Sequence, residues 1–279
     1  MKIALKNWFL PVSLAIVLVI LLKVFFISKV VMKDDSMQQS IFKGETVFYT
    51  KQPASKRNSI VVFRTEKEDD NLFLKRQVGL PGDTIEISNS IIYINGQRLN
   101  EQEGVSFTYS FETDSINSVS NYLISNKILF NIRAAYLGYF TCNTDMNGLK
   151  ILNANPYIKN IRRAVVESFV KQSSSIIMAT EFYWNKDNLG PVIIPRKGTY
   201  INLGQKSFFL YKEIIEKESR KKLVHKNNIF YLGKQEIKEY TFQMNYYFLL
   251  NDNRTNYSDS RWFGFVADNQ IIGTYLFAI

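Results

Sequence analysis

Histidine and cysteine are nearly absent from this chain of 279 residues, which contains one of each, His225 and Cys142. A single cysteine cannot form a disulfide within the chain, so cysteine usage leaves the redox compartment open. A zinc site built from histidine and cysteine needs several such ligands, and the composition argues against one. We expect neither a metal nor a cofactor.

The scarcity of histidine also limits the bases available for catalysis. A hydrolase with a serine nucleophile usually takes the hydroxyl proton with a histidine. His225 lies in a lysine-rich run, 212–226, in which acidic residues are interspersed. Such a run is typical of a solvated helix face or a hairpin, and we interpret His225 as a surface residue. Lysine is then the obvious alternative base.

The formal net charge of +10 is compatible with attraction to an anionic membrane surface or to nucleic acid. Apart from the run at 212–226, the basic residues are scattered, and the sequence has no nucleic-acid-binding motif. We therefore expect no nucleic-acid partner.

Long apolar runs are also few, and the one of membrane length lies at residues 8–28. About 20 apolar residues span a bilayer core. Trp8 suits an interface anchor at one end, and Lys23, near the other end, can extend its amine to the interface. A cleaved signal peptide is the alternative, but 25–29, FFISK, is a poor cleavage site. We expect a retained transmembrane helix and a lipid bilayer as partner; the flanking lysines do not decide its orientation.

The rest of the chain is rich in strand signals. Aromatic residues make up 14% of the sequence, which favours strands. Strands are predicted at Thr46–Thr50, Ser59–Arg64, Thr84–Ile87 and Ile91–Ile94, with Asn95-Gly96 as a hairpin turn, and further strands at 240–250 and 270–277. Helices are predicted at Ser125–Tyr136 and Asn160–Ser173.

These patterns predict a mostly β fold: an antiparallel β domain with an irregular α/β insertion and one N-terminal transmembrane helix. The predicted parts are an N-terminal tail (1–7), the transmembrane helix (8–28), the first part of a catalytic β core (34–100), an insertion or second subdomain (101–240) and the last part of the core (241–279).

Ser36 and Lys75 are the candidate catalytic pair. Lys75 lies in an apolar run, 72–78, that ends in a Gly-Leu-Pro-Gly-Asp turn. Burial among apolar neighbours penalises the charged amine, and a neutral lysine can act as a base. From the residues alone, a solvent-facing lysine on a strand and a surface serine remain the plainer interpretation.

Three segments, in order, resemble bacterial type I signal peptidase, a membrane-anchored Ser/Lys endopeptidase of family S26. Residues 36–45, SMQQSIFKGE, resemble its SMxPTLxxGD box. Residues 75–83, KRQVGLPGD, are similar to its KRVxGLPGD box, and 251–261, NDNRTNYSDSR, to its GDNRxNSxDSR box. The resemblance covers roughly 1–100 and 181–279, and 188–198 resembles the longer Bacteroidetes-type members.

The resemblance implies a role for each matching residue. Ser36 is the nucleophile and Lys75 the general base. Four charged residues of the third box have structural roles, bracing the strands around the pair: Asp252, Arg254, Asp259 and Arg261. From the residues alone, these four would belong to a solvated loop.

Four positions depart from the family pattern. Asp34 stands where the family has a Ser or Thr whose hydroxyl helps to form the oxyanion hole. An ionised carboxylate donates no hydrogen bond, and losing one such donor typically costs about 2.7–4 kcal/mol. Tyr257 stands where a serine hydrogen-bonds the lysine. Asp34 and Tyr257 are therefore candidates for oxyanion binding and orientation. The other departures are Gln39 for Pro and Asn251 for Gly.

The resemblance implies a membrane-bound serine endopeptidase that cleaves N-terminal signal peptides from exported preproteins. It also places the catalytic domain on the extracytoplasmic side of the bacterial cytoplasmic membrane. The departures at Asp34 and Tyr257 motivate an alternative: a catalytically weak relative that binds preproteins or a secretion partner. A processing peptidase dedicated to one secretion system is a third option.

Overall fold

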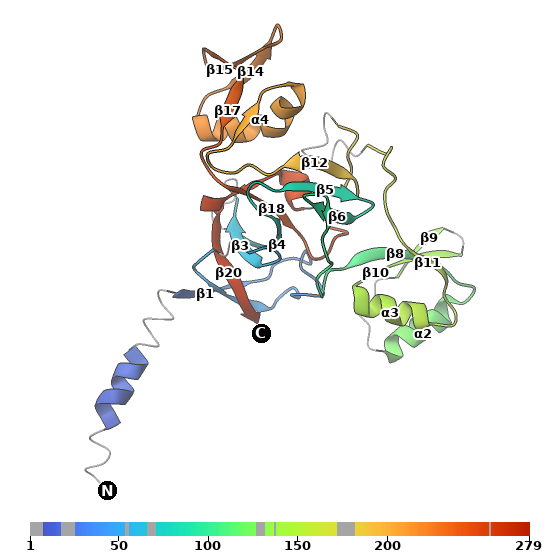
Figure 1. The fold of residues 1–279 in the computed structure, drawn as a ribbon. Helices are drawn as coiled ribbons and strands as arrows, with labels where there is room; N and C mark the ends of the chain where they lie inside the picture. Colours follow the sequence, from blue (N-terminus) through green and yellow to red (C-terminus); the bar gives the residue numbers. More distant parts are fainter. Residues whose placement is uncertain are drawn as a thin grey trace.

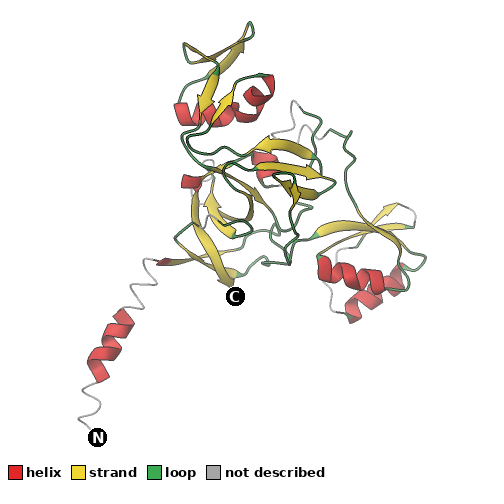
Figure 2. Cartoon of the chain, viewed as in Figure 1, coloured by secondary structure: helices red, strands yellow, loops and turns green. Residues whose placement is uncertain are grey.

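The computed structural model describes residues 8–17, 26–53, 56–65, 71–126, 132–136, 138–171, 182–256 and 258–279. Within these residues strands dominate, as predicted. A central β body carries one lobe above it and a second lobe beside it (Figures 1 and 2).

The central body contains an antiparallel sheet that joins the two ends of the chain. Its strand order is β1-β2-β20-β3-β4-β18-β19. Because β4 pairs with both β3 and β18, the predicted first and last parts of the core share this sheet. The strands are β1 (Ile27–Val31), β2 (Thr46–Thr50), β3 (Ile60–Arg64), β4 (Leu72–Gly79), β18 (Tyr246–Leu250), β19 (Val266–Ala267) and β20 (Ile271–Ala278).

Strand β4 differs from the half-buried strands of the same sheet, such as β2. In β2, buried residues alternate with partly exposed ones, whereas β4 is buried from Leu74 through Gly79. A strand covered on both faces usually consists of apolar residues. Lys75, Arg76 and Gln77 therefore lie at buried positions where each polar group requires a partner.

A second antiparallel sheet, in the order β12-β5-β6-β7, lies beside the first. Its strands are β12 (Leu189–Ile193), β5 (Thr84–Ser88), β6 (Ile91–Ile94) and β7 (Gln97–Arg98). The predicted Asn95-Gly96 hairpin connects β6 and β7, and both turn residues have positive φ, 53° and 77°. Asn and Gly tolerate this region better than other residues, which explains why the local signal was sufficient.

The upper lobe packs against this second sheet. Helix α4 (Gln205–Ser219) and β14 (Leu223–Lys226) occupy the lysine-rich run, which thus contains a helix face followed by a hairpin strand. One hydrophobic cluster includes residues of β5, β12 and α4. The lobe's other strands are β13 (Tyr200–Asn202), β15 (Ile229–Leu232), β16 (Gln235–Ile237) and β17 (Glu239–Thr241).

The strand predicted at 240–250 is interrupted. β17 ends at Thr241, and β18 begins at Tyr246. Between them, the backbone N–H groups of Gln243 and Met244 donate to the Glu218 carboxylate at 2.9 and 3.0 Å. Because these two N–H groups donate to a side chain of α4, they do not form the backbone hydrogen bonds of a strand, and the strand is interrupted here.

The side lobe has its own hydrophobic cluster, formed by Phe111, Val119, Leu123, Cys142 and Leu152. A four-stranded sheet in the order β11-β8-β10-β9 packs with two helices (Figure 1). The elements are β8 (Phe107–Glu112), α2 (Ile116–Ser125), β9 (Arg133–Tyr136), β10 (Tyr139–Thr144), α3 (Met146–Ala154) and β11 (Lys159–Arg163).

Both helix predictions in this region were wrong. Within Ser125–Tyr136, α2 ends at Ser125 and 133–136 form strand β9; residues 127–131 lie outside the described residues. Within Asn160–Ser173, residues 160–163 belong to β11, and no helix occurs through 171. β9 pairs with β10, and β11 pairs with β8. This long-range pairing overrides local helix propensity.

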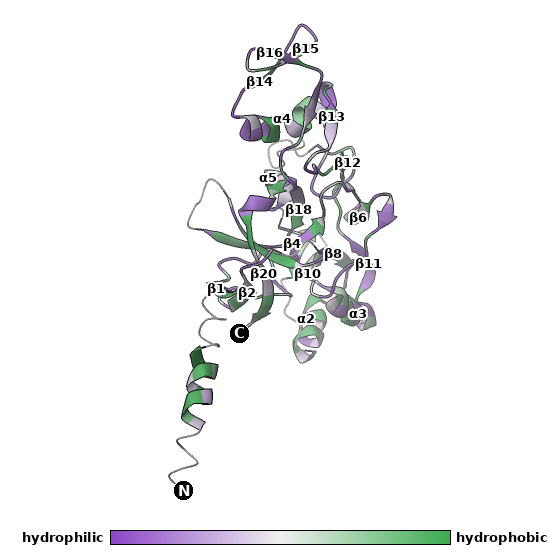
Figure 3. Ribbon diagram, turned by 60° about the vertical axis from the view of Figure 1, so that its left-hand side comes forward, coloured by the Kyte–Doolittle hydropathy of each residue, from purple (hydrophilic) through white to green (hydrophobic). Residues whose placement is uncertain are grey.

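The N-terminal helix projects away from the body (Figure 3). Residues 8–17 are helical, and large apolar side chains such as Trp8, Phe9 and Leu10 are exposed. Residues 18–25 of the predicted span lie outside the described residues. Across the described residues, no helix reaches the length and apolar character needed to cross a membrane.

Candidate active site

Ser36 and Lys75 meet in the interior of the central body. Ser36 begins the turn at 36–40, after β1, and Lys75 lies in β4 opposite Val61 of β3. Lys75 Nζ donates a hydrogen bond to Ser36 Oγ at 2.9 Å. The two residues are 2% and 0% exposed, respectively. The same distance suits transfer of the serine proton to a neutral amine.

Burial changes the protonation of Lys75. Removal from water lowers the pKa of Lys75 below its ordinary value of 10.5, and the carboxylates of Asp34, Asp259 and Asp252 oppose this decrease. Desolvation prevails because the ammonium loses more hydration free energy on burial than it gains from attraction to these carboxylates. Burial therefore shifts Lys75 toward the neutral amine that a general base requires.

Asp34 accepts a hydrogen bond from the backbone N–H of Ser36, with its Oδ1 2.8 Å away. Burial raises the pKa of Asp34, but hydrogen bonds from the Ser36 hydroxyl and amide, together with the charge of Lys75, bring it below the ordinary value. Asp34 is thus ionised near neutral pH. Its carboxylate thus occupies the backbone N–H of Ser36.

The third box braces β4 from the adjacent loop. Arg76 donates from Nε and Nη2 to the two carboxylate oxygens of Asp252, both at 2.6 Å. Arg261 forms a similar pair with Asp259, at 2.9 and 2.7 Å, and Asp259 also accepts from the Asn251 backbone N–H at 3.0 Å. These carboxylates are fully buried. Charge-assisted paired hydrogen bonds fix orientation, so this loop is held firmly next to Lys75.

Arg254 participates mainly through its backbone. Its N–H donates to the Ser106 carbonyl at 2.9 Å, and its carbonyl accepts from Arg261 Nη1 at 3.2 Å. Burial lowers the pKa of Arg254 to about 10, so its guanidinium stays charged near neutral pH. The third box is therefore joined to Ser106, the residue before β8 of the side lobe.

A turn at the end of β4 completes the second box. Asp83 accepts from the Leu80 N–H at 2.7 Å, from Asn95 Nδ2 at 3.0 Å and from Arg57 Nη1 at 2.7 Å. At Gly79 an added Cβ would lie 2.2 Å from Ile194 Cδ1. This close packing of β4 explains the glycine at that position.

Comparison with known proteins assigns this arrangement to a family. The family model described as "Signal peptidase, peptidase S26" matches residues 5–131 and 192–279. The chain belongs to the signal peptidase family, S26. The unmatched residues, 132–191, include most of the side lobe after α2.

Curated relatives cover part of the chain. It is 34% identical over 100 residues to "Signal peptidase I P" of Bacillus subtilis subsp. natto, an alignment that spans 34% of this chain and 54% of the relative. It is 30% identical over 105 residues to "Signal peptidase IB" of Staphylococcus aureus, spanning 36% of this chain and 54% of the relative. The chain thus spans about half the length of the curated relatives it matches.

The departure at Gln39 from the signal peptidase pattern has a structural basis. Gln39 has φ +82°, which a proline ring cannot adopt because it fixes φ near −65°. The first residues leading to the side lobe pack against this turn: an added Cβ at Gly104 would lie 2.4 Å from Ser40 Oγ and 3.2 Å from the Gln39 carbonyl. The turn at 36–40 is thus shaped together with the segment that leads into the side lobe.

The other sequence candidates are only partly placed. Tyr257 lies outside the described residues. His225 is exposed on β14 in the upper lobe and stacks on Phe230, with ring centroids 4.4 Å apart, as expected for a surface residue. Cys142 is buried in the cluster of the side lobe.

Sequence reasoning missed two residues that hold the site together. Asn253 donates from its backbone N–H to the Ser36 carbonyl at 2.9 Å and from Nδ2 to the Asp35 carbonyl at 3.1 Å. The Ser260 hydroxyl accepts from the Leu249 N–H at 2.8 Å. Both lie in the third box, and that position was the signal available for finding them.

A cavity of about 380 Å³ opens beside the Ser/Lys pair. Asp34 and Lys75 line it together with aromatic side chains of β3, β4 and the loop around α5 (Ser260–Phe263). The aromatic residues are Phe63, Phe73, Trp262, Phe263 and Phe265. Asp34 and Lys75 thus lie at one wall of this cavity, called the apolar cavity below for its aromatic walls, although its lining also includes Glu213, Lys217 and Gln270.

Proposed function

We propose that the chain is a membrane-anchored serine endopeptidase that removes N-terminal signal peptides from exported preproteins. The observation that carries this proposal is the 2.9 Å contact between Lys75 Nζ and Ser36 Oγ in a buried site. Membership of the signal peptidase family and the names of the curated relatives support the substrate class.

In the proposed reaction, neutral Lys75 takes the proton from Ser36 Oγ as the oxygen attacks the scissile carbonyl. The tetrahedral intermediate then collapses, and Lys75 returns the proton to the leaving amine, which departs with the mature protein. Water, activated by the neutral amine, hydrolyses the acyl-enzyme and releases the signal peptide. Asp252, Arg254, Asp259 and Arg261 keep β4 and the third box in place around Lys75.

Asp34 determines how the oxyanion is accommodated. In the resting arrangement its carboxylate accepts from the Ser36 N–H, and Ser36 is fully buried. A substrate carbonyl needs that N–H when negative charge develops on its oxygen. Substrate binding must therefore displace the Asp34 side chain.

The apolar cavity accommodates the signal-peptide side of the substrate. Its aromatic walls favour apolar chain over charged chain. The resemblance implies small side chains at the positions before the scissile bond, and these allow the carbonyl to reach a nucleophile located in the interior.

The apolar segment that begins at Trp8 and ends before β1 anchors the enzyme in the cytoplasmic membrane, with the catalytic domain on the extracytoplasmic side; Ile27 and Ser28 of the predicted span 8–28 belong to β1. The exposed apolar side chains of helix 8–17 support the anchoring, and the resemblance to the family supports the orientation. A preprotein whose apolar signal segment lies in the same membrane could then present its cleavage site to the enzyme while that segment stays in the bilayer.

The test uses the full chain in phospholipid vesicles with a purified preprotein. We expect the wild type to cleave it, Ser36→Ala to abolish cleavage and Lys75→Ala to slow it by at least about 10²-fold. His225→Ala, at the exposed histidine, should leave the rate unchanged. Full activity in either Ser36→Ala or Lys75→Ala would refute the assignment of the pair.

The alternative, a catalytically weak protein that binds preproteins, is favoured by the occupied Ser36 amide. The substitution Asp34→Ser separates the two proposals. A large gain in cleavage shows that the native chain lacks a functional oxyanion site, and a loss shows that Asp34 contributes to catalysis. A dedicated peptidase would use the same Ser/Lys pair and differ in accepting one preprotein among many.

A further inference from the structure

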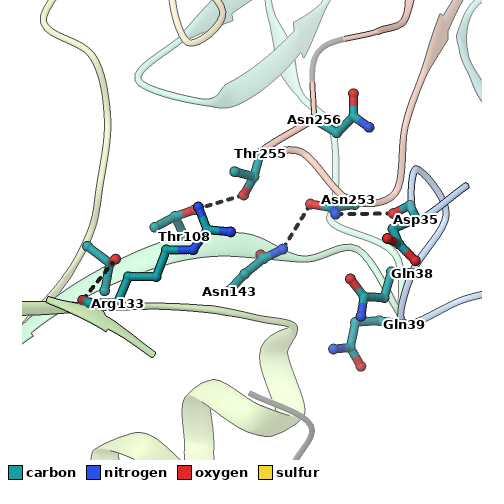
Figure 4. Close-up of a pocket in the computed structure, with 10 residues that line it drawn as sticks. Asp35, Gln38, Gln39, Thr108, Arg133, Asn143, Asn253, Thr255 and Asn256 are labelled. Carbon is teal, nitrogen blue, oxygen red and sulfur yellow. Dashed lines mark hydrogen bonds between the residues drawn. The ribbon is translucent and has the colours of Figure 1, made fainter. Parts of the chain in front are cut away.

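A second, polar cavity lies beside the loop that carries Ser36. Its volume is about 550 Å³. Three parts of the chain line it: the nucleophile turn, the third box and the side lobe. The lining residues are Asp35, Gln38, Gln39, Thr108, Arg133, Thr141, Asn143, Asn253, Thr255 and Asn256 (Figure 4).

Hydrogen bonds connect the walls of this polar cavity. Asn143 Nδ2 donates to Asn253 Oδ1 at 2.9 Å, and the hydroxyls of Thr108 and Thr255 lie 2.7 Å apart. Asn253 in turn holds the carbonyls of Asp35 and Ser36. The side lobe is thus fixed to the nucleophile loop through one asparagine, and the cavity is a built feature of the fold.

Neighbouring residues of the loop at Ser36 line the two cavities. Asp34 lines the apolar cavity, and Asp35 lines the polar one. A peptide whose scissile carbonyl lies at Ser36 therefore extends into one cavity before the bond and into the other after it. An apolar signal segment would leave the amides and hydroxyls of the polar cavity without partners, so it belongs in the apolar one.

We propose that the polar cavity binds the first residues of the mature protein, those that follow the scissile bond, and selects for an acidic side chain among them. This inference rests on the proposed function. It adds that the side lobe contacts the mature segment of the substrate. Amides and hydroxyls in the walls pair with the backbone of the mature segment, and Arg133 pairs with its carboxylate.

The charges of the polar cavity determine where along the mature segment an acidic residue is preferred. Asp35 adjoins the nucleophile, whereas Arg133 lies on β9 across the cavity, with Asn143 and Asn253 between them (Figure 4). No carboxylate of the described residues lies within ion-pair distance of Arg133, so its guanidinium can meet an acidic side chain of the substrate. Acidic residues are therefore favoured a few positions beyond the bond, and not directly next to it.

The experiment compares two sets of peptides with the same signal-side sequence. The short substrate carries a fluorophore directly after the scissile bond, and the extended substrates continue with a mature segment in which Asp, Asn or Lys is placed at successive positions. The full chain in vesicles is assayed as wild type, Arg133→Glu and Arg162→Glu. Arg162→Glu is the matched control, because it makes the same charge change at an exposed position of the same lobe outside the cavity.

We expect wild type and Arg162→Glu to prefer the best-placed Asp over Lys by about fivefold in kcat/KM, the size of one partly exposed ion pair. Arg133→Glu should reverse this preference while cleaving the short substrate at the wild-type rate. That unchanged rate also shows that the variant is folded.

Equal kcat/KM for Asp and Lys peptides in the wild type, or Arg133→Glu behaving like Arg162→Glu, would overturn the inference and leave the proposed function intact. If no substrate is cleaved, the proposed function fails. Fluorescence anisotropy with Ser36→Ala then tests the inference separately: equal affinity for short and extended peptides would refute it.

Discussion

The carboxylate of Asp34 and the backbone N–H of Ser36 are hydrogen-bonded at 2.8 Å, next to a lysine whose amine contacts the same serine. Asp34 therefore acts on both halves of the proposed mechanism. Its charge opposes the loss of the Lys75 proton, and its oxygen holds the amide that the reaction needs.

The first prediction concerns the pH profile of Asp34→Asn. Burial lowers the pKa of Lys75, and the charge of Asp34 opposes that decrease. Because Lys75 is active when neutral, kcat/KM rises as the pH increases through its pKa. Removing the negative charge lowers this pKa further, so the acid limb should move to lower pH. Asp35→Asn serves as the control, and a shift of the acid limb to higher pH would contradict the electrostatic account.

The second prediction concerns Lys75→Met, which should reduce cleavage by roughly 10²–10⁴-fold, the usual contribution of a general base. Its effect on stability has the opposite sign. The pKa of Lys75 in the folded protein lies below the 10.5 of the unfolded chain. Between these two pKa values the unfolded chain binds a proton that the folded chain does not, so the free energy of unfolding of the wild type decreases as the pH falls through this window. Methionine removes that loss.

Urea unfolding at several pH values measures this effect. The free energy of unfolding of the wild type should decrease toward lower pH over that window relative to Lys75→Met. If the free energy of unfolding depended on pH in the same way in both proteins, burial of the charged lysine would not destabilise the folded state.

The third prediction concerns the buried pair of Arg76 and Asp252. Asp252→Ala leaves the guanidinium buried without its carboxylate, which typically costs about 3–5 kcal/mol of unfolding free energy. The double variant Arg76→Met with Asp252→Leu removes both charges and should recover most of the loss. Chemical denaturation of the three proteins provides the measurement, and a double variant less stable than Asp252→Ala would contradict this account.

The sequence predicted the β class, several strands and the Ser/Lys contact for identifiable reasons. The Asn95-Gly96 hairpin depends on two adjacent residues with positive φ, so local information was enough. The proximity of Ser36 and Lys75 came from the family boxes and not from alternation in β4, because that strand is buried on both faces.

The failures arose where distant segments decide local structure. Strand β11 contains Lys159, Arg162 and Arg163 and forms by pairing with β8. The interruption before β18 depends on Glu218 of α4, which is distant in sequence. The capture of the Ser36 amide by Asp34 was missed because the identity of a residue does not reveal the direction of its side chain.

The fourth prediction concerns Gln39, where the family has proline. Its φ of +82° is inaccessible to a proline ring, so Gln39→Pro should destabilise the protein by more than about 1 kcal/mol and displace the turn at 36–40. Gln39→Gly should be neutral or stabilising, because glycine adopts positive φ without strain. Thermal unfolding compares the two variants, and a stable, active Gln39→Pro would show that the turn is not constrained as described.

Gly104 places a limit on exchanging parts between relatives. No side chain fits at this position, because Ser40 Oγ and the Gln39 carbonyl occupy the space. A chimaera that transplants a side lobe from another member must therefore retain glycine here or bring its own nucleophile turn. The unit of exchange includes both the lobe and the segment at 36–45, although about 60 residues of sequence separate Gly104 from that segment.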